Sequence, residues 1–109
     1  MFETESFREQ IEKAIIREAS RNYMTEYEPA IVPYLQRLAS DNESILMERE
    51  LRKVASERRG IEEALRSVAK LTREASQNAS SEGRKVLHLS DIQNAYKAKF
   101  CQFWPFCKS

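Results

Sequence analysis

His88, Cys101 and Cys107 are the side chains of this 109-residue chain best suited to metal binding or nucleophilic chemistry. They provide at most three zinc ligands and lack the paired-cysteine spacing of structural zinc sites, and a disulfide would need an oxidising compartment. His88 has no carboxylate or nucleophile in a motif around it, which favours a structural or exposed role over general-base catalysis. There is also no glycine-rich phosphate loop. The sequence therefore predicts a protein that is not an enzyme, with no metal, cofactor or small-molecule substrate.

Charged side chains at residues 84–91 could form a structural ion pair. Ser90 precedes Asp91 and Gln93 in a capping-box pattern, so we expect a helix to begin at about Asp91, whose charge suits the first turn. Arg84 lies at the other end of the short intervening segment. A charge-assisted bond between Arg84 and Asp91 would clamp the loop to the helix.

The segment that positions this pair begins where a helix ends. Gly83 can adopt the left-handed conformation that ends a helix by satisfying its last carbonyl groups. Residues 86–89 are too short and too rich in strand-forming side chains for a helical turn. We therefore expect an extended segment whose backbone must pair with another part of the protein.

This arrangement resembles the second half of a histone fold, in which an arginine in the second loop pairs with the aspartate that opens the third helix. Arg84 and Asp91 match that pair in identity and spacing, within a resemblance that extends over about residues 54–100. Lys85 matches the lysine that archaeal and related histones present to DNA, although Val86 replaces the threonine that usually follows. The resemblance implies an all-α histone fold, with the order helix, loop, long helix, loop, helix, over residues 43–100.

Two amphipathic helices precede this region and form a predicted N-terminal helical extension, residues 1–42. Ser6 and Glu9 form a capping box before a helix over residues 7–24. Residues 25–28 break the pattern. Pro29 then suits the first turn of a second helix, whose apolar residues are Ile31, Val32, Leu35 and Leu38.

Within the histone-like region, we expect a first helix over residues 43–53 and a first loop near residues 52–55. Ser56 is then the N-cap of the long helix, and the alternative is an uninterrupted helix through Gly60. An apolar stripe between Ile61 and Ala79 gives this helix one hydrophobic face. In a histone fold two such helices cross in a dimer, so the resemblance implies a homodimer or a heterodimer with another histone-fold chain.

Residues 101–109 form an aromatic C-terminal tail. Pro105 stops the third helix at or before Trp104. An exposed aromatic tail of this kind would be prone to aggregation unless it packs on the domain or on another protein. The candidate partner-binding residues are Phe103, Trp104 and Phe106.

Charge is distributed unevenly. Residues 56–109 carry ten basic and six acidic groups, a net charge of +4, whereas the remainder carries eight basic and eleven acidic groups, a net charge of −3. The whole chain has a formal net charge of +1, so nucleic-acid binding should be local and salt-sensitive. With no signal peptide or membrane-spanning run, we expect an intracellular, soluble protein that is nuclear if eukaryotic or nucleoid-associated if prokaryotic.

Two function classes follow from these observations. The first is a histone-fold protein that dimerises and contacts DNA phosphates without sequence readout, alone or in a chromatin or nucleoid complex. The residues assigned to DNA binding by the resemblance and by their place near loops are Lys85, Arg52, Lys53, Arg58 and Arg59. The alternative is a protein-only interaction or regulatory module that uses the dimer face and the aromatic tail, which the near-neutral charge favours.

Overall fold

The computed structural model describes residues 4–41 and 56–100, and for residues 41, 56–60, 99 and 100 it describes the backbone alone. The described part is mostly helical, with four α-helices, two short strands and one π-helical turn. In chain order the elements are α1 (Glu5–Arg21), β1 (Glu26–Tyr27), α2 (Ile31–Asp41), α4 (Ser56–Ser81), β2 (Val86–Leu87), α5 (Leu89–Ala95) and η1 (Tyr96–Phe100).

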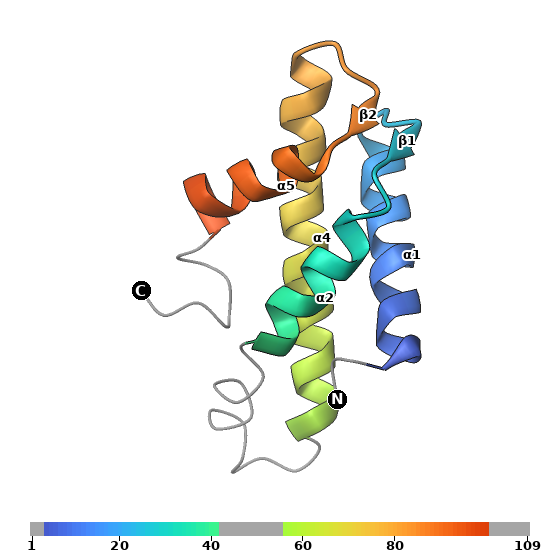
Figure 1. Cartoon of the computed structure of the whole chain (residues 1–109), viewed down its shortest axis with the longest axis vertical. Helices are drawn as coiled ribbons and strands as arrows, with labels where there is room; N and C mark the ends of the chain where they lie inside the picture. The colour runs from blue at the N-terminus through green and yellow to red at the C-terminus, as the bar shows by residue number, and fades with distance from the viewer. Residues whose placement is uncertain (1–3, 42–55, 101–109) are drawn as a thin grey trace.

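The two longest helices, α1 and α4, pack side by side and run in the same direction (Figure 1). Each leads into a short strand at the same end of the molecule, and each is followed by a second helix. The second helix packs against the first helix of its own half, α2 on α1 and α5 on α4. The described chain therefore consists of two helix–strand–helix halves.

The strands join the halves. β1 and β2 pair in parallel, with Glu26 opposite Val86 and Tyr27 opposite Leu87, so each residue faces the one 60 positions away. The extended segment predicted at residues 86–89 is confirmed at Val86–Leu87, and its backbone partner is β1. The sequence predicted only a break between helices at residues 25–28. A strand of two residues is too short to show the alternation of apolar and polar side chains that would predict it.

Both first helices end with the same hydrogen bonds. After α1, the amides of Tyr23 and Met24 donate to the carbonyls of Ser20 and Ala19. After α4, the amide of Gly83 donates to the carbonyl of Ser80 and that of Arg84 to the carbonyl of Ala79, again 60 residues further on. This is the Schellman pattern, which needs one left-handed residue. Gly83 has φ 79°, as the sequence predicted, and Tyr23 has φ 67°.

In the part of the chain that the structure describes, one hydrophobic core lies between the two halves. Its largest fully buried side chains are Phe7, Ile11, Ile15, Ile31, Leu35, Leu71, Leu87 and Ile92. The predicted N-terminal extension supplies five of these eight, so α1 and α2 build the core jointly with α4 and α5. The apolar stripe of α4, which suggested a dimer, is covered in the described structure by helices of the same chain.

Helix starts were predicted only in part. α1 begins at Glu5, because Thr4 rather than Ser6 is the N-cap and its hydroxyl accepts from the Phe7 amide at 3.1 Å. α4 begins at Ser56, so the residue predicted to be its N-cap is already the first residue of the helix, which continues through Gly60. The predicted helix 43–53 and loop 52–55 lie outside the described residues.

α5 also begins earlier in the chain than the sequence predicted. This helix begins at Leu89 with His88 as N-cap, so Ser90 lies inside it. Asp91 replaces the predicted cap by accepting from the His88 amide at 2.9 Å, because a carboxylate in the third helical position can reach back to that amide.

Candidate functional site

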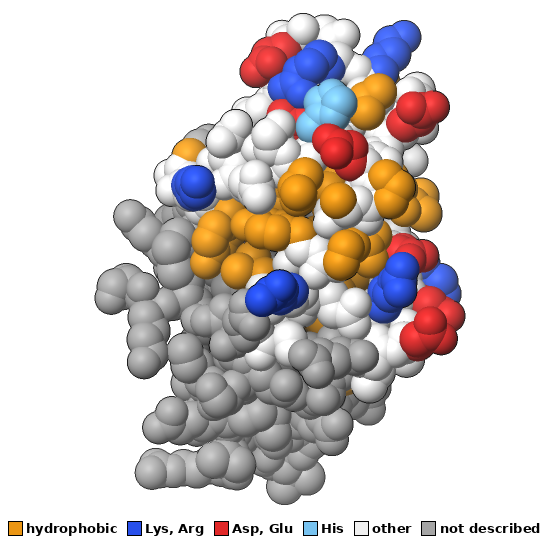
Figure 2. Space-filling model, viewed as in Figure 1, with side chains coloured by type: hydrophobic (Ala, Val, Ile, Leu, Met, Phe, Trp, Pro, Cys, Tyr) orange, Lys and Arg blue, Asp and Glu red, His pale blue; other side chains and the backbone are white. Residues whose placement is uncertain are grey.

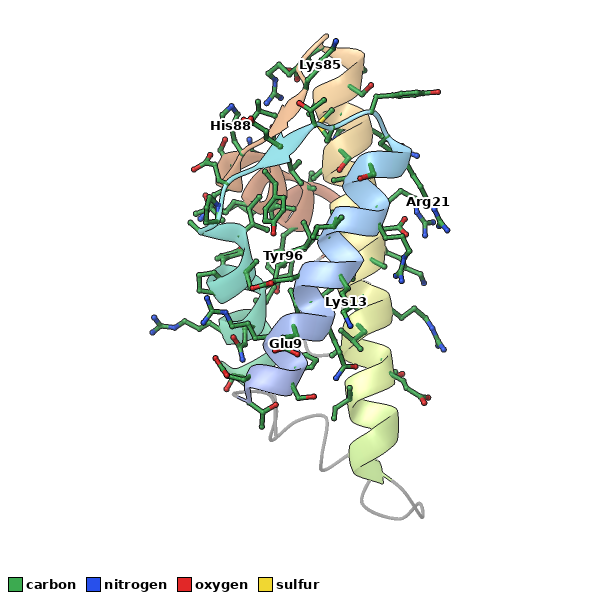
Figure 3. The ribbon with its side chains drawn as sticks, turned by 90° about the vertical axis from the view of Figure 1, so that its right-hand side faces the viewer. Glu9, Lys13, Arg21, Lys85, His88 and Tyr96 are labelled. Atoms are coloured by element: carbon green, nitrogen blue, oxygen red, sulfur yellow. The ribbon has the colours of Figure 1, made fainter. Side chains whose placement is uncertain are left out.

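A basic groove lies between α1 and α4, on the side of the molecule that faces the viewer in Figure 3. Its volume is about 690 Å³. Five of its lining side chains are basic: Lys13, Arg17 and Arg21 from α1, and Arg66 and Arg73 from α4. Two lining side chains, Glu18 and Glu62, are acidic, which leaves a local charge of +3 in a chain whose total is only +1.

Helical spacing explains how these cations converge. Lys13, Arg17 and Arg21 follow one another at intervals of four residues and therefore share one face of α1. Arg66 and Arg73 are separated by seven residues, or two turns, on α4. Because the two helices lie side by side, the two rows face the same groove, and Figure 3 shows Lys13 and Arg21 on the α4 side of α1.

The buried carboxylate of Glu18 binds three of the arginines that line the groove. Its side chain is only 3% exposed, and it accepts from Arg73 at 3.0 Å and from Arg17 and Arg21 at 3.4 Å each. Burial raises the pKa of Glu18, but hydrogen bonds from Arg73 and Arg17 outweigh burial and keep the pKa below its ordinary value. One buried carboxylate thus positions three half-exposed guanidinium groups, which retain a net positive charge between them.

A second polar cluster surrounds the paired strands. Arg84 makes a bidentate ion pair with Asp91, at 2.9 and 2.8 Å, and a further ion pair with Glu82. Burial raises the pKa of Asp91, but hydrogen bonds from Arg84 and the His88 amide lower it below the ordinary value. The charge-assisted contact predicted between Arg84 and Asp91 is present, and its role as a clamp stays a prediction.

Glu28 links the end of β1 to the start of α5. Its carboxylate lies 2.8 Å from His88 Nδ1 and accepts from the Leu89 amide at 3.1 Å. The Glu28 amide donates to the Leu87 carbonyl at 2.9 Å. His88 lies beside the strands at the start of α5 (Figure 3), so its contacts are with the joint between the halves.

The residues assigned to DNA binding from sequence do not form one described cluster. Lys85 is exposed in the turn before β2, at the end of the molecule where the two turns lie together. Arg58 and Arg59 lie in the first turn of α4, where only the backbone is described. Arg52 and Lys53 lie outside the described residues, as do the partner-binding candidates Phe103, Trp104 and Phe106.

Sequence reasoning missed the basic groove because α1 was interpreted as an extension of the acidic half. The interval of four residues between Lys13, Arg17 and Arg21 was a readable signal of one basic helix face. The contribution of α4 was not readable, since nothing local to Arg66 or Arg73 indicates which helix lies beside them.

Hydrophobic side chains form a second surface feature. Figure 2 shows them gathered over α2 and α5. Partly buried members packed against the core include Tyr34, Leu38, Leu89 and Tyr96. Burial raises the pKa of Tyr34, an effect increased by Tyr96 nearby, and burial likewise raises the pKa of Tyr96. Both phenols therefore stay neutral at physiological pH.

Comparison of the chain with protein-family models, curated proteins and solved structures finds no match. Within residues 4–41 and 56–100, no three side chains of the His, Cys, Asp or Glu types are grouped to hold a metal ion. No described helix is both long and apolar enough to cross a membrane.

Proposed function

We propose that this protein binds DNA through its phosphate backbone, without sequence readout, with the α1/α4 groove as the main contact surface. The observation that carries the proposal is the convergence of five basic side chains from two helices in a chain that is almost neutral as a whole. Local charge of this kind attracts a polyanion by releasing its counterions. Contacts to phosphates position a protein on DNA but do not specify bases.

The cations on α1 are spaced so that they can contact phosphates along the backbone of one DNA strand. Lys13 and Arg21 are eight residues apart on α1, which corresponds to about 12 Å along the helix axis. One strand of duplex DNA advances about 3.4 Å along the duplex axis per phosphate, so a row of this length can reach more than one phosphate of the same strand. Arg66 and Arg73 provide a second row beside it.

The paired turns support a histone-like variant of the proposal. A histone dimer presents paired loops from two chains, whereas here the turns before β1 and β2 pair within one chain. Lys85 lies exposed beside that pair and is a secondary DNA contact. The proposal therefore does not require a second chain, and the specific histone fold and the dimer are proposals that rest on the resemblance alone.

A charge-reversal variant of the groove tests the proposal. Lys13→Glu combined with Arg66→Glu changes two exposed cations that line the groove and have no ion-pair partner among the described residues. Fluorescence anisotropy with a labelled DNA of random sequence should show affinity at least about tenfold weaker at low salt. The slope of log affinity against log salt should fall by about 2, since each lost phosphate contact removes about 0.9.

Lys97→Glu is a matched control because Lys97 is exposed on η1 and does not line the groove. The DNA affinity of Lys97→Glu should stay within about threefold of the wild type, because Lys97 lies outside the groove. Equal losses per reversed charge for Lys97→Glu and for the groove variant would show that overall charge, and not the groove, governs binding. Lys85→Ala should weaken binding by an intermediate amount.

A protein-only interaction module is the second candidate. The hydrophobic side chains over α2 and α5 favour it, because apolar surface beside a core is the usual feature of protein contacts (Figure 2). Wild-type protein that binds no DNA even at low salt would favour this candidate over the first.

A further inference from the structure

Tyr23 is the most exposed large hydrophobic side chain among the described residues, with 79% of its surface accessible. It follows the end of α1, and its backbone has φ 67°, in the left-handed region that residues other than glycine rarely adopt. A bulky aromatic residue is costly there because its Cβ approaches the neighbouring carbonyl oxygen. Tyr23 therefore combines an unfavourable backbone conformation with a side chain that contributes little to the core.

The second half of the molecule shows what this turn needs structurally. At the position 60 residues later, Gly83 adopts φ 79° and makes the same pattern of hydrogen bonds. Glycine fulfils the role without strain, so neither the helix end nor the strand pair requires a tyrosine at residue 23. Strained residues that the fold does not require are concentrated at functional sites.

The position of Tyr23 indicates its ligand. It lies two residues beyond Arg21, the last cation of the row that Lys13 and Arg17 begin along the groove. A basic track combined with an exposed aromatic ring is the arrangement by which proteins bind single-stranded nucleic acid, because the cations follow the backbone and the ring stacks on a base. In a duplex the bases are already stacked on each other.

We propose that Tyr23 stacks on a base of single-stranded nucleic acid whose phosphate backbone lies along the α1/α4 groove. This inference rests on the proposed function and specifies its ligand as a single strand. The turn after α1 is then a binding element, whereas the turn after α4 is structural.

The test compares a labelled 15-nucleotide oligo-dT with a duplex of the same length, by anisotropy at low salt. Wild-type protein should bind the single strand more tightly than the duplex. Tyr23→Gly should weaken oligo-dT binding by roughly 5- to 100-fold, the effect of removing one stacked base, and leave duplex binding within about twofold. Tyr23→Phe, which keeps the ring, should retain oligo-dT affinity.

Thermal melting separates this role from a structural one. Tyr23→Gly removes the left-handed strain, so its Tm should equal that of the wild type or rise by up to about 5 °C. A folded Tyr23→Gly variant with undiminished oligo-dT affinity would overturn the inference while leaving the groove proposal intact. Wild-type protein that binds neither DNA would overturn both, and a preference for duplex would overturn the inference alone.

Discussion

The two halves of the molecule follow the same path with different chemistry. Both contain a long helix, a Schellman turn, a strand and a second helix, and the strands pair residue for residue at a separation of 60 positions. In the second half the turn is tied to the next helix by the Arg84–Asp91 ion pair. The equivalent positions in the first half are Met24 and Ile31, which are both buried in the core.

This difference shows that the backbone arrangement does not depend on one kind of side-chain contact. An ion pair joins the turn to α5 in the second half, whereas two side chains buried in the core occupy the equivalent positions in the first half. The equivalent residues Glu28 and His88 even contact each other across the joint, at 2.8 Å. The two halves are therefore joined by a side-chain contact as well as by the paired strands.

Ile31→Ala should have the largest effect on stability. Ile31 is fully buried at the start of α2, so the substitution removes apolar contacts and leaves a cavity. We expect the free energy of unfolding to fall by about 3 kcal/mol, measured by urea denaturation. Ile16→Ala is the control, because Ile16 is 51% exposed on α1 and should change stability by no more than about 0.5 kcal/mol. Similar losses at both positions would contradict the view of Ile31 as the hydrophobic counterpart of Asp91.

Asp91→Ala should have a smaller effect, of about 1–2 kcal/mol, because Arg84 is partly solvent-exposed and screening weakens the pair. The loss should depend on pH. Since the pKa of Asp91 is lowered in the folded protein, its contribution to stability is complete at neutral pH. That contribution is lost as the pH falls below about 4 and through the lowered folded-state pKa.

Urea denaturation of wild type and Asp91→Ala at pH 7 and at pH 3 measures this dependence. The difference in unfolding free energy between the two proteins should shrink at the lower pH. A difference that stays constant would mean that Asp91 contributes to stability by packing and not by its charge. Ile31→Ala measured in parallel should show the same loss at both pH values.

Gly83→Ala should have the smallest effect and sharpens the comparison between the two turns. No atom of a described residue beyond the two chain neighbours lies within 4 Å of the added Cβ, so the left-handed φ of 79° is what opposes the alanine. We expect a loss of about 1 kcal/mol by thermal melting. Tyr23→Gly, the opposite exchange at the equivalent turn, should leave the Tm unchanged or raise it. Stabilisation by Gly83→Ala would contradict the strain argument for both residues.

Local pattern was sufficient for much of the helical structure. The apolar spacing of residues 31–38 and the left-handed Gly83 were predictable because each depends on neighbours within one or two helical turns. The Arg84–Asp91 contact was predictable for the same reason, since only seven residues separate its partners. The start of α4 near Ser56 was predicted from the length of the central helix that the histone-fold resemblance implies.

Tertiary structure alone decided the features that join distant residues. The pairing of β1 with β2, the contact of Glu28 with His88 and the bond from Arg73 to Glu18 connect positions 55 to 60 residues apart. No local periodicity encodes such pairings, because they depend on which helix faces which in the folded core. The sequence by itself determined where cations and helices occur, and the packing of α1 on α4 determined that those cations form a groove.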